Sequence, residues 1–148
     1  MANLNIGELV TELTQYASED INRQLGLSPW YDQTRGNRCD LLTRYVLEGL
    51  RCRGVNTVRR ELHQDPDTLD WHFMLAHSPL GEKPSSSDTV SDLNPWRGGG
   101  DRGSGILHGA RETVMHIMGQ NKVPKSLVEL RSIQTITEAH HEGDNPYR

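Results

Sequence analysis

The stretch LRCRGVNTVRREL, Leu50 to Leu62, places four arginines within ten consecutive positions, 51 to 60. The 148-residue chain nevertheless has a formal net charge of -4. The wider segment 35–61 holds seven arginines and three acidic residues, so it carries +4 and the rest of the chain carries -8. Because Gly54 is a typical helix stop and Asn56 or Thr57 a typical helix start, the stretch predicts a corner between two helices.

Working outward from this corner, the apolar spacing predicts five or six helices and no strand. The longest, 5–25, has a capping-box-like start at Asn5 and a stop at Gly26, and a second runs from 39 to about 53. Segment 78–105 is rich in Ser, Gly and Pro, which is typical of a mobile loop, and 140–148 is expected to fray. We therefore expect one all-α domain, 1–148, which is a compact bundle of short helices. The remaining predicted helices are 57–65, 67–77, 106–118 and a segment that begins near 124.

The arginines give the leading functional hypothesis. On a helical wheel, Arg44 and Arg51 lie opposite Leu42, two turns apart, and are predicted to face water. A guanidinium group binds phosphate oxygens in a fork, and no lysine interrupts the set. The pattern favours a non-enzymatic, regulatory protein that grips the phosphate backbone of RNA, possibly double-stranded. The predicted nucleic-acid-binding residues are Arg35, Arg38, Arg44, Arg51, Arg53, Arg59 and Arg60.

Two other functions stay open beside RNA binding. The arginines could pair with an acidic protein partner, in which case the chain is a helical adaptor that docks through its first helix or the Trp71 to Leu75 edge. A metal-dependent enzyme could instead use a ladder of side chains four residues apart on one helix, His108, Glu112 and His116. The arginines could equally form ordinary ion pairs on a solvated face.

The remaining motifs predict no catalytic residue, metal site or cofactor. No CxxC or HExxH pattern occurs, and the glycine-rich segment 94–105 lacks the Gly-Lys-Ser/Thr ending of a phosphate-binding loop. Cys39 and Cys52 are thirteen residues apart, about 20 Å along one helix, and are read as spectator thiols. No apolar run approaches the ~18 residues of a membrane span, and no signal peptide is evident. We expect a cytoplasmic or nuclear protein whose thin apolar core favours a homodimer.

Overall fold

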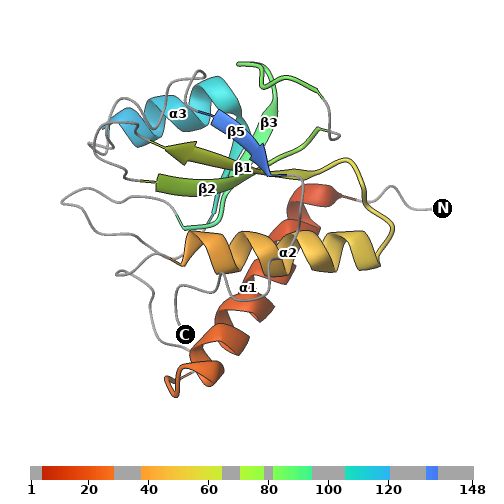
Figure 1. The fold of residues 1–148 in the computed structure, drawn as a ribbon, viewed down its shortest axis with the longest axis vertical. Helices are drawn as coiled ribbons and strands as arrows, with labels where there is room; N and C mark the ends of the chain where they lie inside the picture. The colour runs from red at the N-terminus through yellow and green to blue at the C-terminus, as the bar shows by residue number, and fades with distance from the viewer. Residues whose placement is uncertain are drawn as a thin grey trace.

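A computed structural model describes residues 5–28, 38–64, 71–78, 82–94 and 106–120, together with the backbone of 133–136. Two helices lie on one side of a five-stranded sheet and a third lies on the other (Figure 1). The prediction of an all-α bundle is therefore wrong, because the fold is mixed α/β. In chain order the elements are α1 (Ile6–Gln24), α2 (Cys39–Cys52), β1 (Arg59–Gln64), β2 (Trp71–Ala76), β3 (Thr89–Asp92), β4 (Leu107–Ala110), α3 (Arg111–Gln120) and β5 (Ile133–Ile136).

The first two helices agree with the sequence prediction. The Asn5 side chain accepts a hydrogen bond from the backbone N–H of Glu8 at 3.1 Å, so it caps α1 as expected. Gly26 and Gly54 follow the two helices with φ angles of 73° and 79°, a left-handed conformation that glycine adopts without steric cost. The local stop and start signals around α1 and α2 were therefore sufficient to place both helices.

The sheet is antiparallel throughout and its strand order is β4-β3-β2-β1-β5. In the register of the two central strands, Leu62 lies opposite Phe73 and His63 lies opposite His72. β3 pairs with β2 only near the end of β2, where Leu75 lies opposite Ser91. This topology brings β2 into the middle of the sheet, with the end of β3 beside it.

The predicted helices at 57–65 and 67–77 are strands, and burial on both faces of the sheet explains the error. Alternate residues of β1 point to opposite faces, and both faces are covered. Polar residues such as Arg59 and Glu61 consequently lie inside, where ion pairs compensate them. An interior strand with charged residues does not alternate between apolar and polar residues. The sequence therefore lacks the two-residue hydrophobic period by which a strand is usually predicted.

The predicted loop and the later helices also need correction. Segment 78–105 was expected to be mobile, yet it supplies β3, and Val90 and Leu93 within it are buried in the core. The helix predicted at 106–118 is instead β4 followed by α3. Ile133–Ile136, assigned to a final helix, pairs with β1 as β5. The tail predicted to fray, 140–148, lies outside the described residues.

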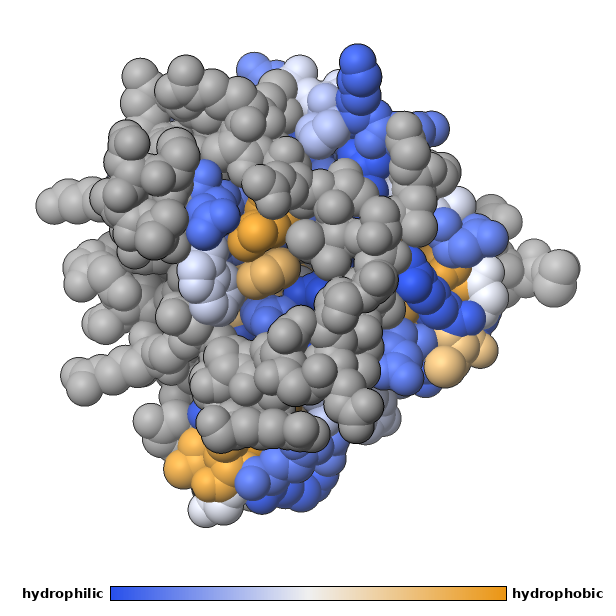
Figure 2. Space-filling view, viewed as in Figure 1, coloured by the Kyte–Doolittle hydropathy of each residue, from blue (hydrophilic) through white to orange (hydrophobic). Residues whose placement is uncertain are grey.

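Two apolar cores lie on opposite faces of the sheet. The larger joins α1 and α2 to the sheet and includes Val10, Leu42, Leu50 and Leu75, whereas the smaller, under α3, includes Met74. Figure 2 shows that hydrophilic residues cover most of the described surface on the face in view. None of the described helices combines the length and the apolar character needed to cross a bilayer.

Candidate functional site

The predicted arginine clamp does not form one exposed surface. Four of its members are at most 5% exposed, and two are exposed on the last turn of α2 and just after it. Arg44 in particular is buried, in contrast to the prediction that it faces water beside Arg51. The reason is that α2 is packed between α1 and the sheet, so little of its predicted polar side meets solvent. The buried members are Arg38, Arg44, Arg59 and Arg60, the exposed ones are Arg51 and Arg53, and Arg35 lies outside the described residues.

Two of the buried arginines share one carboxylate in the first turn of α2. Arg44 donates from Nε and Nη2 to the two oxygens of Asp40, each at 2.9 Å. Arg60, on β1, donates to the same carboxylate and, from Nε, to Thr43 Oγ1 at 3.0 Å. Arg38 makes a further buried hydrogen bond to Asn22 on α1. These guanidinium groups therefore tie the start of α2 to its neighbours.

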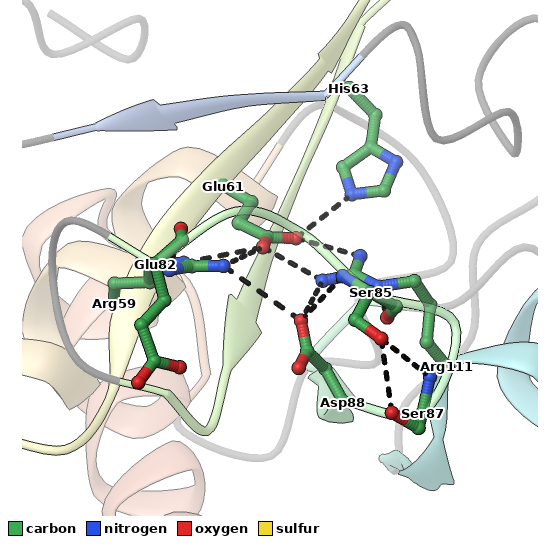
Figure 3. Close-up of polar contacts among 8 residues, drawn as sticks. All are labelled: Arg59, Glu61, His63, Glu82, Ser85, Ser87, Asp88 and Arg111. Atoms are coloured by element: carbon green, nitrogen blue, oxygen red, sulfur yellow. Dashed lines mark hydrogen bonds and ion pairs between the residues drawn. The ribbon is translucent and has the colours of Figure 1, made fainter.

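Arg59 belongs to a second buried network on the α3 side of the sheet (Figure 3). Glu61 lies 2.8 Å from Arg111 and 3.3 Å from Arg59, and Asp88 lies 3.4 Å and 3.8 Å from the same two guanidinium groups. Burial alone would raise the pKa of Glu61, but hydrogen bonds from His63 and Arg111 lower it to about 2. The network joins three parts of the fold, namely β1, α3 and the turn before β3. Its guanidinium groups and carboxylates face one another.

The metal ladder predicted at His108, Glu112 and His116 does not exist on one helix. His108 is on β4 and the other two residues are on α3, where His116 approaches Gln120 at 3.2 Å. His108 Nδ1 instead lies 2.7 Å from Ser91 Oγ. Within the part of the chain that the structure describes, no three His, Cys, Asp or Glu side chains are placed to hold a metal ion.

Three residues that the sequence analysis did not select come from the start of α2, from β2 and from the end of β3. Cys39 is the first residue of α2, His72 lies on β2 and Asp92 ends β3. His72 Nε2 is 2.9 Å from Asp92 Oδ1, and Cys39 lies close enough to His72 to raise the pKa of its imidazole. All three are completely buried. The backbone N–H of Asn94 also donates to Asp92 Oδ1, at 3.0 Å, which helps to fix the carboxylate.

The electrostatics of these three residues favour a charged imidazole. Burial alone would lower the pKa of His72, but the charge and hydrogen bond of Asp92, together with those of Cys39, raise it to about 9. An imidazolium beside a thiol stabilises the thiolate in turn, because opposite charges favour each other's ionised form. The imidazole of His72 thus has the carboxylate of Asp92 on one side and Cys39 as a further neighbour.

The start of α2 adds a second feature. Arg38 occupies the N-cap position of α2, although arginine rarely caps helices. Among the described contacts, its side chain makes no capping hydrogen bond. The first backbone N–H groups of a helix have no partner inside the helix, and they favour negative charge. The start of α2 therefore favours a negatively charged group.

Comparison of the chain with protein-family models, with curated proteins and with solved structures gives no match. The functional argument consequently depends on the geometry of the site itself. The sequence signals that could have found it were weak. Cys39 begins a predicted helix, but no sequence motif or fixed spacing links it to His72 or Asp92.

Proposed function

We propose that the protein is an enzyme with a cysteine nucleophile that transfers or hydrolyses acyl groups of ester, thioester or amide substrates. The single observation that carries this proposal is the convergence of Cys39, His72 and Asp92 from three separate elements. Such a set of nucleophile, base and orienting group is recognised by its geometry and recurs on unrelated folds. This proposal replaces the expectation of a non-enzymatic protein.

Because Cys39, His72 and Asp92 are completely buried, the proposed reaction begins with a local opening of the fold that admits the substrate to Cys39. In the first half-reaction, the thiolate of Cys39 then attacks the carbonyl carbon of the substrate. The carbonyl oxygen becomes negatively charged and is stabilised by the backbone N–H groups at the start of α2. Nε2 of His72 faces Asp92, which holds the imidazole in place. The imidazolium gives its proton to the leaving group, the carbonyl bond to that group breaks, and a thioester on Cys39 remains.

In the second half-reaction, neutral His72 takes a proton from water or another acceptor nucleophile, which attacks the thioester. The carbon–sulfur bond then breaks, and the thiolate of Cys39 and the imidazolium of His72 are restored together. Asp92 keeps the imidazole oriented and stabilises its charged form throughout. Each group therefore returns to its starting protonation state after one cycle.

A reactive thiolate needs a reducing environment, since a disulfide or an oxidised sulfur would remove the nucleophile. Cys39 and Cys52 are both present as thiols in the structure. We therefore propose that the enzyme is cytoplasmic, which agrees with the localisation expected from the sequence.

The proposal is tested with an activated aryl ester as a general acyl donor. The Cys52→Ser protein, which retains only Cys39 as a thiol, is expected to release a burst of one equivalent of the phenol and to gain the mass of one acyl group. Adding Cys39→Ser should abolish the burst. Changing His72 to Gln should slow it by at least about 100-fold, in the range of a lost general acid–base. A protein that folds but gains no acyl group would contradict the proposal.

RNA binding and docking to an acidic partner remain untested predictions. Of the arginines chosen for them, Arg51 and Arg53 are exposed, and Arg53 donates to the carbonyl oxygen of Gly49 at 3.0 Å. No described contact favours either function over the acyl-transfer proposal. A homodimer likewise remains a prediction.

A further inference from the structure

We propose that Arg60 is a positioning residue, which holds the helix bearing Cys39 and the strand bearing His72 in the relative placement that the reaction needs. This inference rests on the proposed acyl-transfer function. Arg60 contacts the residue that follows Cys39 and the residue that follows His72. One guanidinium group therefore bridges the chain neighbours of both reacting residues.

On the helix side, Arg60 binds the first turn of α2 at two points. It donates to the carboxylate of Asp40 and, from Nε, to Thr43 Oγ1 at 3.0 Å. These two acceptors are three residues apart on the helix, so a rigid, planar fork fixes both the rotation and the height of the first turn. Cys39 stands immediately before Asp40, and its sulfur moves with this turn.

On the strand side, Arg60 is anchored by its own position in the sheet. It lies on β1 opposite Leu75 of β2. Its guanidinium carbon is 4.6 Å from the centre of the Phe73 ring, a stacking distance for a cation on an aromatic face. Because Phe73 follows His72 on β2, the stack limits movement of the guanidinium group relative to the strand that holds the imidazole.

Burial and charge both suit this role. Arg60 is 2% exposed, so its contacts are not exchanged for contacts with water. Burial and the charge of Arg44 lower the pKa of Arg60, whereas Asp40 and Cys39 oppose that effect. The guanidinium group therefore lies close enough to Cys39 to interact with it electrostatically. The geometric bridge is the basis of the inference, and the charge adds to it.

The same carboxylate provides a matched control. Arg44 pairs with Asp40 at 2.9 Å, and both of these residues belong to α2. Arg44→Met removes one guanidinium partner of Asp40 while leaving the bridge to the sheet in place. Arg60→Met removes the bridge, and Arg60→Lys keeps a positive charge without the planar fork.

All variants are made in the Cys52→Ser protein, and three measurements are compared. The rate of the ester burst reports acylation, the ultraviolet absorbance of the thiolate as a function of pH reports Cys39 ionisation, and circular dichroism reports folding. Arg60→Met is expected to slow acylation by about 10- to 100-fold, the range for a misplacement of the reacting groups. It should also move the thiolate midpoint to higher pH. The loss should appear in kcat rather than in KM.

Arg60→Lys should fall between Arg60→Met and the parent, and Arg44→Met should acylate within about twofold of the parent. If Arg60→Met does not fold, Phe73→Leu tests the same bridge by removing the stack, and slower acylation is again expected. A folded Arg60→Met protein, or failing that a folded Phe73→Leu protein, with the parent rate and thiolate midpoint would overturn the positioning role. A parent protein without any acyl-enzyme would instead overturn the proposed function, so the two failures are distinguishable.

Discussion

Replacing Glu61 with glutamine is expected to be one of the most destabilising single changes in the chain. The carboxylate is completely buried and compensates two guanidinium groups, those of Arg59 at 3.3 Å and Arg111 at 2.8 Å. After the change, Asp88 is the remaining described carboxylate near both, at 3.8 Å and 3.4 Å. Removing one partner of a buried ion pair costs about 3–5 kcal/mol, because the other charge stays buried.

That cost is a large part of the ~5–15 kcal/mol that stabilises a typical domain. For a chain of this size it corresponds to a decrease in Tm of about 6 to 20 °C. The assay is urea unfolding monitored by circular dichroism, with Glu19→Gln as control. Glu19 pairs with Arg23 at 3.9 Å, and Arg23 is 60% exposed, so this surface pair should contribute less than about 1 kcal/mol.

The double change Glu61→Gln with Arg111→Met completes the test. Since it removes a charge of each sign, it should destabilise the protein by less than the sum of the two single changes. If Glu61→Gln unfolds within about 1 kcal/mol of the parent protein, the network does not stabilise the fold in the way described.

Three further predictions concern pH and binding. The folded-state pKa of Glu61 is about 2, below its ordinary value of 4.5, so the carboxylate stabilises the fold above pH 4.5 and loses this effect as the pH falls towards 2. Acid unfolding of the parent and of the Glu61→Gln protein measures the difference. Equal pH profiles for the two proteins would refute the prediction. Burial, with the charge of His108, lowers the pKa of His77 to about 4, so stability should fall between pH 6.5 and 4, and a His77→Gln protein that keeps this loss would contradict the assignment. A gel shift with duplex RNA across a salt series tests the RNA hypothesis: if it is right, changing Arg51 and Arg53 to Glu abolishes binding, and a parent protein that binds no RNA sinks it.

The helices at the start of the chain could be predicted from the sequence because their signals are local. Asn5 at the start of α1 and glycines after both helices specify ends without reference to the rest of the fold. The apolar spacing of α1 also matches a helix that is buried on one side and exposed on the other. Both features survive in the structure.

The strands could not be predicted, because their pattern depends on partners distant in the sequence. Arg60 and Leu62 point to one face of the sheet and Glu61 and His63 to the other, and both faces are interior. A charged residue inside a strand is stable only with its counter-ion, and for Glu61 one of those is Arg111, fifty residues away. Periodicity alone therefore assigned the segment to a helix.

The candidate site was missed for the same reason. Cys39, His72 and Asp92 stand far apart in the sequence and follow no fixed spacing, so only the pairing of β2 with β3 and the packing of α2 against β2 bring them together. The arginine enrichment around Cys39 was evident from the sequence, but the internal contacts of these arginines were not. Arg38, Arg44 and Arg60 bind Asn22 and Asp40 inside the fold, and their contact with phosphates stays an untested prediction.

The central claim is that Cys39 is an activated nucleophile, and competition between the two cysteines tests it most directly. The wild-type protein is treated at pH 6 with less than one equivalent of iodoacetamide, and the modified cysteine is identified by peptide mass spectrometry. Cys52 is exposed and Cys39 is buried, so an ordinary thiol at position 39 would react second. The account predicts that Cys39 is alkylated first and that His72→Gln reverses the order. Labelling of Cys52 alone in the folded wild-type protein would contradict it.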